Sequence, residues 1–293
     1  MGRSDGPPRV LEGEWLPPRL ADLEEPPARL YLHGELPRGP AVAIVGTREC
    51  SPEGIAFTRG FAAELAAAGV AVLSGGAEGI DTAAHEGALD VGGVTVVVAP
   101  AGLSKPFPSA NTALFRRIVD SGGAYLSLVE DEVPATRSVF FARNACLMAM
   151  AHAVVMTETP VAGGTSNASK WARELGRPLF VVPHSPWHVP GRGCVEQMRL
   201  GARPLHRAKD VLKLLEAAGL RGLPPKPVQG ELPLPIAGMD PVLEALRAGA
   251  CHADEICDRT GLSLPVVQQR ILTLALSGVL VPGPWGSLKL VTH

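Results

Sequence analysis

From residue 41 onward, short apolar runs typical of strands buried on both faces alternate with stretches of helical character. The apolar runs are Ala41–Val45, Val70–Leu73, Val94–Ala99, Ala124–Val129, Ala153–Met156 and Pro178–Val182. The helical stretches are Gly54–Ala68, Asp81–Leu89, Thr112–Asp120, Ala142–Ala151, Ser166–Leu175, Val195–Leu200 and Ala208–Ala218. Because such alternation implies βαβ crossovers, the sequence predicts an α/β domain over residues 41–218, with an extended Rossmann-like, mostly parallel sheet.

The chain on either side of this domain differs in character. Residues 1–40 are proline-rich and irregular, which predicts an extended N-terminal arm. Residues 219–239 contain five prolines, so we expect a semi-extended linker there. After the linker we expect three helices, with Ser263 as a candidate N-cap, and then a hairpin. The expected elements are Pro241–Ala248, Ala253–Thr260, Ser263–Leu276, Val279–Pro282 and Ser287–Val291. This layout predicts a small winged-helix domain over residues 240–293.

The overall composition narrows the class of protein. A hydrophobic fraction of 46% with 19% charged residues describes a globular chain, and a net charge of −2 gives no general attraction to polyanions. Any binding of nucleic acid must therefore come from a local site. The chain has no apolar run long enough to cross a membrane, no signal peptide at its start, and five cysteines without a C-x-x-C pair. These features predict a cytoplasmic protein with reduced thiols.

A glycine-rich turn follows the second predicted strand. Gly75, Gly76 and Gly79 lie between that strand and a helix expected to begin near Asp81. Glycines allow positive φ angles and a close approach of a ligand, and the N-terminus of a helix offers unpaired N–H groups to a phosphate. A phosphate-binding loop and a tight turn without a ligand are both compatible with this spacing.

Cations and aromatic residues follow the carboxyl ends of the other strands, where ligands of doubly wound sheets bind. A groove that lines phosphates with Arg and Lys and stacks bases on aromatic rings is typical of proteins that bind single-stranded nucleic acid. The candidate DNA-binding residues are Arg48, Lys105, Arg137, Phe140, Arg143, Asn144 and Lys170. The candidate framework of the phosphate loop is Gly46, Thr47, Ser51, Ser74, Gly75, Gly76, Gly79, Ile80, Asp81 and His85.

Other chemistries have weaker support. The first strand is followed by Gly46-Thr47-Arg48 instead of G-x-G-x-x-G, which argues against NAD or FAD, and we expect no cofactor. His184 and His188 are separated by a proline and cannot share a helix face, so we expect no metal site there. Asp81 and His85 have no nucleophile beside them in the sequence, so we expect no catalytic residues.

The main alternative is a Rossmann-like nucleotide or nucleoside-monophosphate hydrolase. Glu158, followed by Gly163-Gly164-Thr165, could belong to such a site. Hydrolases of the lysine-decarboxylase-like kind carry a P-G-G-x-G-T-x-x-E signature. The stretch 161–166 keeps the Gly-Gly pair of that signature but lacks the Gly-Thr and Glu that should follow.

Several motifs together resemble the bacterial DNA-processing protein A family, also called DprA or Smf. The two main motifs are Ile44–Arg48 with Ser51, and Ser74–Asp81 with Ala84 and His85. Further matches are Phe107-Pro108, Asn111, Phe140, Arg143-Asn144, Gly176-Arg177, Val182-Pro183 and Gly201-Ala202. The N-terminal matches are Leu16-Pro17, Leu20, Pro26-Pro27, Leu30-Tyr31 and Gly34, so the resemblance covers nearly all of the chain from about Leu16.

The resemblance implies a homodimer that binds single-stranded DNA and loads the RecA recombinase during natural transformation, without established catalysis. It places Arg48, Arg137, Phe140, Arg143, Asn144 and Lys170 in or near the DNA-binding face. The matching glycines, with Ser74 and Asp81, correspond to the framework of the loop.

This chain departs from the family pattern at several positions. Glu78 replaces an Arg of the glycine loop, Phe141 replaces a Pro, and Cys146 lies near the position of a lost second Arg. Gly163-Gly164 stands where the family pattern has a Ser-Gly pair, and His184 replaces a Gly. Two fewer cations imply two fewer phosphate contacts, so we expect weakened DNA binding with a shallower salt dependence.

The winged-helix region, which resembles the family's appended domain, is not basic. Residues 235–293 contain four cations and five carboxylates, and the recognition-like helix carries Gln268, Gln269 and Arg270. This balance favours a contact with protein over the recognition of duplex DNA.

Overall fold

The computed structural model describes residues 7–161, 163–185, 187–222, 241–262, 264–276, 279–282 and 287–290. The chain divides into two compact units, Met1–Val228 and Gln229–His293. No helix of the described residues is long and apolar enough to span a membrane.

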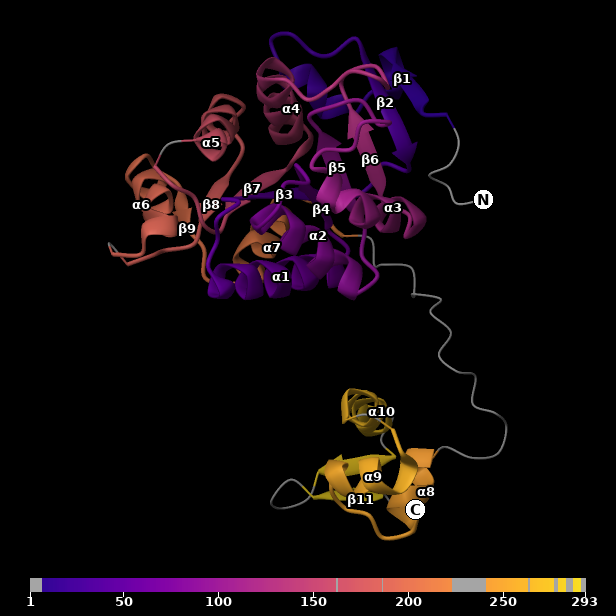
Figure 1. Cartoon of the computed structure of the whole chain (residues 1–293). Helices are drawn as coiled ribbons and strands as arrows, with labels where there is room; N and C mark the ends of the chain where they lie inside the picture. The colour runs from indigo at the N-terminus through magenta and orange to yellow at the C-terminus, as the bar shows by residue number, and fades with distance from the viewer. Residues whose placement is uncertain are drawn as a thin grey trace. The chain divides into compact units, whose positions relative to one another are not determined.

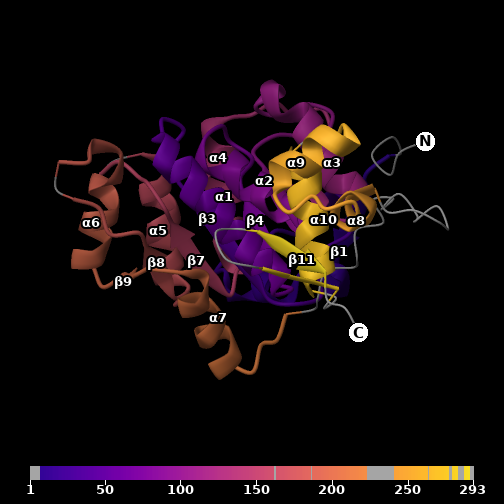
Figure 2. The same cartoon turned by 90° about the horizontal axis from the view of Figure 1, so that it is seen from below.

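The larger unit contains a nine-stranded sheet (Figure 1). Its strands are β1 (Arg9–Glu12), β2 (Arg29–Gly34), β3 (Ala41–Val45), β4 (Ala71–Ser74), β5 (Thr95–Ala99), β6 (Ala124–Ser127), β7 (Ala153–Met156), β8 (Leu179–Val181) and β9 (Arg203–Pro204). They are ordered β1-β2-β6-β5-β4-β3-β7-β8-β9, with β1 and β9 at opposite ends (Figures 1 and 2). All pairs from β6 to β9 are parallel, which confirms the predicted α/β class.

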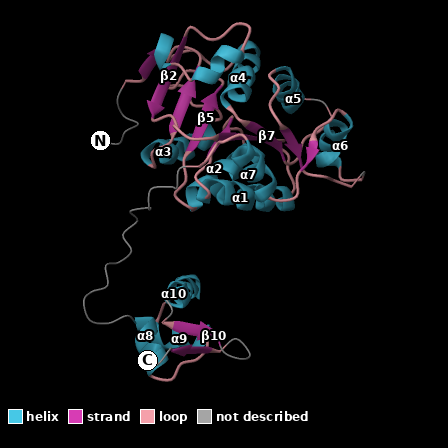
Figure 3. Cartoon of the chain, turned by 180° about the vertical axis from the view of Figure 1, so that it is seen from behind, coloured by secondary structure: helices cyan, strands magenta, loops and turns pink. Residues whose placement is uncertain are grey.

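Helices cover both faces of the sheet, so that the strands form a layer between them (Figure 3). One face packs against α1 (Pro52–Ala67), α2 (Ile80–Asp90), α3 (Thr112–Asp120) and α7 (Ala208–Ala217). The other face packs against α4 (Arg137–Met150), α5 (Gly164–Glu174) and α6 (Arg192–Arg199), together with the short 3-10 helix η2 (Pro18–Asp22).

The continuous apolar runs of the central strands follow from this double cover. In β3, Val42 and Ile44 belong to the core beneath α1 and α2, whereas Ala43 and Val45 belong to the core beneath α4. All four side chains are buried. Successive side chains of a strand point to opposite faces, so a strand that is buried on both sides needs apolar residues throughout.

The expectation of an irregular N-terminal arm was wrong for residues 9–34. Strand β2 pairs antiparallel with β6, and β1 pairs antiparallel with β2, so this segment completes one end of the sheet. Leu30 and Leu32 are buried in the core, and Leu20 of η2 is buried beside them. The pairing buries these few apolar side chains, and the prolines of the segment lie outside β1 and β2.

The smaller unit has three helices and a two-stranded antiparallel sheet. These are α8 (Pro241–Arg247), α9 (Ala253–Thr260), α10 (Leu264–Leu276), β10 (Leu280–Pro282) and β11 (Leu288–Leu290). Gly261 ends α9 with a φ of 68°, as expected for the break before the third helix. The proposed N-cap at Ser263, the turn at 283–286 and linker residues 223–239 lie outside the described residues.

Candidate nucleic-acid interface

The glycine loop connects β4 to α2 and closes on a carboxylate of its own helix. Gly76 and Gly79 have φ angles of 76° and 82°, which explains why glycine occurs at both positions. The carboxylate of Asp81 accepts hydrogen bonds from the amides of Gly75, at 3.2 Å, and Ala77, at 3.3 Å. These two amides are therefore already satisfied by Asp81, and a phosphate would have to be held mainly by side chains.

The side chain of Arg143 provides a cation above this loop. It projects from α4, is 6% exposed, and lies so close to Gly75 that a Cβ atom there would collide with the guanidinium group. Burial lowers the pKa of Arg143, and the neighbouring carboxylate of Asp81 opposes that change. Because the ordinary pKa of arginine lies far above 7, the guanidinium stays charged.

Two cations lie close to the ring of Phe140. The guanidinium carbons of Arg48 and Arg143 are 5.9 Å and 5.6 Å from the centre of its ring. Phe107 meets the same ring edge-on, with 5.5 Å between ring centres. On the same helix, the guanidinium carbon of Arg137 lies 5.5 Å from the centre of the Phe141 ring. The arrangement thus places aromatic faces and positive charge side by side.

Apart from Phe107, these side chains line an open groove of about 640 Å³ at the carboxyl ends of β3 and β7. Below, "the groove" means this hollow and the smaller pocket that adjoins it at Arg48, Ala77, Phe140 and Arg143. Of the residues predicted from sequence, those lining it are Gly46, Thr47, Arg48, Gly75, Asp81, Arg137, Phe140, Arg143 and Asn144.

Two predicted DNA-binding residues do not line the groove. Lys105 forms an ion pair with Glu132 at 2.9 Å, and Lys170 forms one with Glu174 at 3.6 Å. All four side chains are well exposed. Asn144 does reach the groove, and its amide donates to the carbonyl of Gly164 and to the side chain of Asn167.

Most of the remaining framework residues hold the strand ends in place. The Ser74 hydroxyl donates to the Ile44 carbonyl, and the Ser51 hydroxyl caps α1 by accepting from the Gly54 amide. Ile80 is fully buried and packs against Gly46, where a Cβ atom would collide with it. These residues therefore position the loops around the groove.

His85 is buried in the same framework and bonds to the Thr95 hydroxyl at 2.7 Å. That hydroxyl donates to the Val72 carbonyl, so Nδ1 of His85 carries the proton and donates to it. Burial, aided by the charge of Arg143, lowers the pKa of His85 to about 3. The imidazole is therefore neutral at physiological pH.

Two aromatic residues that line the groove were absent from the predicted set. Phe107 lies in the loop after β5, and Phe141 follows Phe140 on α4. The signal for Phe107 was available, because an aromatic residue in a loop after a parallel strand satisfies the same positional rule as the residues that were chosen.

Two departures from the family pattern have different consequences. Glu78 is exposed and lines the groove, and among the described residues it has no ion-pair partner. Cys146 is fully buried in the core, where burial raises the pKa of its thiol to about 12. Only Glu78 can act directly on a bound anion.

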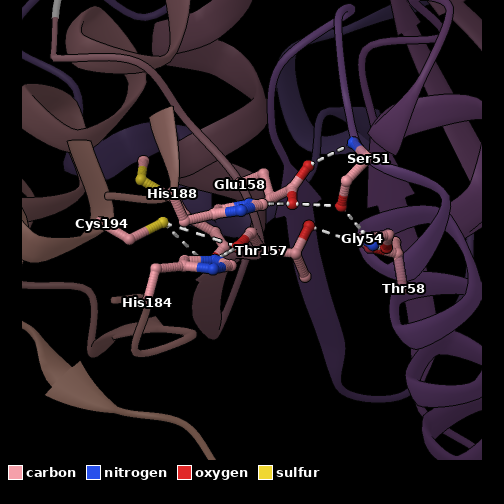
Figure 4. Close-up of polar contacts among 9 residues, drawn as sticks. Ser51, Gly54, Thr58, Thr157, Glu158, His184, His188 and Cys194 are labelled. Atoms are coloured by element: carbon pink, nitrogen blue, oxygen red, sulfur yellow. Dashed lines mark hydrogen bonds and ion pairs between the residues drawn. The ribbon is translucent and has the colours of Figure 1, made fainter. Parts of the chain in front are cut away.

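Glu158, the centre of the hydrolase alternative, does not line the groove. Its carboxylate is buried and accepts hydrogen bonds from the amide and hydroxyl of Ser51, at 2.8 Å and 2.6 Å (Figure 4). His188 also donates to it, at 2.6 Å. A carboxylate engaged in this way at the start of α1 is poorly placed to reach a substrate in the groove, so the arrangement does not favour hydrolysis.

His184 and His188 lie side by side, although the sequence predicts no helix face that they could share. Their rings stack with 4.7 Å between centres, beside Glu158 (Figure 4). Helical spacing was the wrong criterion, because residues 182–185 and 187–188 are irregular and bring the two imidazoles together without a helix.

Comparisons with known proteins identify relatives of both units. A sequence model described as DNA recombination-mediator protein A matches residues 10–216, and one described as DprA winged helix domain matches residues 233–284. A relative from Mycobacterium tuberculosis, named as a DNA processing protein DprA, is 35% identical over 82% of this chain, which spans 61% of that relative's length. Protein Smf of Escherichia coli is 29% identical over a stretch that covers 95% of this chain and 76% of the length of Smf.

Solved structures give the same result. A structure of DNA processing protein A from Helicobacter pylori superposes with a TM-score of 0.66 and 28% identity, covering 74% of this chain and 99% of that one. A structure of DprA from Streptococcus pneumoniae gives a TM-score of 0.66 and 29% identity, and the match covers 70% of this chain and 73% of the DprA chain in that structure. With a family model matching most of the chain, this protein belongs to the DNA recombination-mediator protein A (DprA) family.

Proposed function

We propose that this protein binds single-stranded DNA in the groove and promotes the loading of RecA onto that DNA during natural transformation and homologous recombination. The observation that carries the proposal is the grouping at Phe140, where the guanidinium carbons of Arg48 and Arg143 lie 5.9 Å and 5.6 Å from the centre of the aromatic ring. The Helicobacter pylori relative is described by its single-stranded DNA binding mode, which supports the same assignment.

The chemistry of the groove favours single strands over duplexes. A base in a single strand can stack on an exposed aromatic ring, whereas the bases of a duplex already stack on one another. Phe107 and Phe141 are 36% and 40% exposed, so both are accessible to such stacking. Arg48, Arg137 and Arg143 supply the positive charge that the phosphates need, although the chain as a whole carries a net charge of −2.

The proposal is for a binding protein without catalysis. Asp81 bonds to the amides of its own loop, and Glu158 bonds to Ser51 and His188, so both buried carboxylates serve structural hydrogen bonds. The same proposal includes a homodimer and a contact with RecA, which the resemblance to the family implies, and a cytoplasmic location, which the cysteine pattern favours.

The affinity for DNA is expected to be modest. Glu78 is exposed in the groove at a position where the family pattern has Arg, and its carboxylate repels a phosphate that approaches the loop. One charge of the wrong sign at the site replaces one favourable phosphate contact.

The proposal is tested by fluorescence anisotropy with labelled oligo-dT and a duplex of equal length. We expect a preference for the single strand, weakened about tenfold or more by Arg48→Ala, because a charge-assisted hydrogen bond contributes about 1.5–3 kcal/mol. Arg199→Ala is the matched control, since Arg199 is 77% exposed, pairs with Glu196 and does not line the groove. Equal affinity for duplex and single strand at low salt would contradict the proposal.

RecA loading is tested separately. The protein should increase the rate of RecA filament formation on single strands, and Arg48→Ala should reduce that increase. If the wild-type protein binds single strands but leaves the filament rate unchanged, DNA binding stands and the mediator role is lost.

A further inference from the structure

Three potential metal ligands converge beside β7, on the side of Glu158 that faces away from α1 (Figure 4). Glu158 follows β7, His184 follows β8, and His188 precedes the short 3-10 helix η4 (Val189–Gly191). One ligand atom from each of the three side chains lies within 4.8 Å of the others. Sequence motifs of the family do not account for this cluster, because His184 replaces a Gly of the family pattern.

The hydrogen bonds of the cluster fix the protonation of both rings. Nε2 of His188 bonds to the Glu158 carboxylate, and Nε2 of His184 bonds to the Thr157 carbonyl, each at 2.6 Å. Both partner oxygens can only accept, so each Nε2 carries a proton. In His184 the bond to a backbone carbonyl is the outer-shell contact that commonly orients a metal-bound histidine, and it leaves Nδ1 as the lone-pair donor.

The cluster also supplies a negative charge. The Glu158 carboxylate accepts hydrogen bonds from the amide and hydroxyl of Ser51 and from Nε2 of His188, and three such donors favour its ionised form. The carboxylate is therefore ionised at neutral pH, and Ser51 holds it in place from the far side.

We propose that Glu158, His184 and His188 form a binding site for a transition-metal dication of the Zn²⁺ class. Two imidazole nitrogens and one carboxylate oxygen are the three protein ligands of a common zinc site, with a fourth position open to water. This ligand set favours Zn²⁺ over Mg²⁺ and Ca²⁺, which prefer oxygen ligands alone.

Loading requires a defined movement of one ring. With bonds of about 2.0 Å, the ligand atoms of a tetrahedral site lie ~3.3 Å apart. The ligand atoms of Glu158, His184 and His188 lie within 4.8 Å of one another, so they must move closer together. The two rings are within 13° of parallel, so one must rotate before both can point to a single ion. His188 is the ring that moves, because its side chain is 29% exposed. Its rotation breaks the hydrogen bond from Nε2 to Glu158, and Nδ1, which carries the lone pair, becomes the ligand atom.

Cys194 is close to the cluster but is not a fourth ligand. Its sulfur lies 3.6 Å from the Thr157 carbonyl in a fully buried position. The sulfur contacts the carbonyls of Met156 and Thr157 and does not belong to the group of ligand atoms that lie within 4.8 Å of one another.

The test is calorimetric titration of the full chain, stripped of metal with a chelator, using Zn²⁺ and then Mg²⁺. We expect one Zn²⁺ per chain, no binding of Mg²⁺, and a loss of more than about 100-fold in Zn²⁺ affinity in His188→Ala, because even outer-shell changes cost about 10–100-fold. His206→Ala is the matched control, since His206 is exposed and outside the cluster. Unfolding temperatures in the presence of chelator show whether each variant is folded.

Two results would overturn the proposal. One is the absence of Zn²⁺ binding tighter than about 10 μM in the wild-type chain. The other is Zn²⁺ binding that survives both His188→Ala and Glu158→Gln, which would place the ion on cysteines elsewhere. The visible spectrum of the Co²⁺-loaded wild type decides the case if the variants do not fold: a tetrahedral nitrogen and oxygen spectrum supports the site, and thiolate charge-transfer bands refute it.

Discussion

The contact between Gly75 and Arg143 gives the sharpest test of the groove, because a single methyl group should displace the central cation without removing it. A Cβ atom at residue 75 would overlap the guanidinium of Arg143, which is 6% exposed and borders the groove. In Gly75→Ala the guanidinium must therefore leave both the loop and the face of Phe140.

The expected loss can be estimated from the contact that is removed. A hydrogen bond from a charged donor contributes about 1.5–3 kcal/mol, which corresponds to a roughly 10- to 150-fold weaker affinity for single-stranded DNA. Loss of one phosphate contact should also lower the salt slope by about 0.7. Crowding of the buried loop should reduce the free energy of unfolding by about 1–3 kcal/mol.

The assay is anisotropy with oligo-dT at two salt concentrations, next to urea unfolding of the same preparations. Gly164→Ala is the control, because Gly164 also lines the groove but has open space where its Cβ atom would lie. The control should bind within about twofold of wild type. If a folded Gly75→Ala protein binds as tightly as the control, with an unchanged salt slope, Arg143 does not contact the phosphates.

Three further predictions follow from the described side chains. Glu78→Arg should raise the affinity for oligo-dT about tenfold at low salt and steepen the salt slope by about 0.7; an unchanged slope would mean that DNA passes by the loop at a distance. Lys105→Ala and Lys170→Ala should each change that affinity less than about threefold, since both lysines are ion-paired away from the groove, and a larger loss would extend the binding surface to that lysine. The pKa of His85 is lowered from 6.5 to about 3, so the unfolded chain binds its proton first and stability is lost as the pH falls below about 6.5. Between pH 7.5 and 5.5 this should remove about 1.4 kcal/mol of unfolding free energy, and His85→Asn should abolish that part of the decrease in urea titrations; an identical decrease in both proteins would exclude His85 as its source.

The central sheet could be predicted because its information is local. Each parallel strand is buried on both faces, so each is visible as an apolar run without knowledge of its neighbours. Strand β2 was missed because its stability comes from pairing with β6, about a hundred residues further along the chain. Strand β9 has only two residues, both exposed, and carries no apolar pattern at all.

The candidate site could be predicted as far as one rule allows, namely that ligands of doubly wound sheets bind at the carboxyl ends of the strands. That rule correctly places side chains at one edge of a sheet, which suffices for Arg48 and Thr47 because they follow β3 directly. It cannot tell where a side chain far along a loop or a helix will point, as Lys105 and Lys170 show. It also has no means of finding His184 and His188, whose proximity depends on the path of an irregular segment.

The glycine loop shows how a correct motif can suggest the wrong reason for its residues. From the sequence, amides free to hold a phosphate were one of two interpretations of its glycines, yet Asp81 already occupies the amides of Gly75 and Ala77. The absence of a side chain at Gly75 instead makes room for Arg143, and the buried charge of Arg143 is balanced by Asp81. The loop and the helix α4 therefore act as one unit, in which the loop positions the cation that we propose contacts the DNA. On this reasoning the effect of Gly75→Ala on DNA binding should match that of removing the Arg143 charge, and the double variant should be no weaker than either single one.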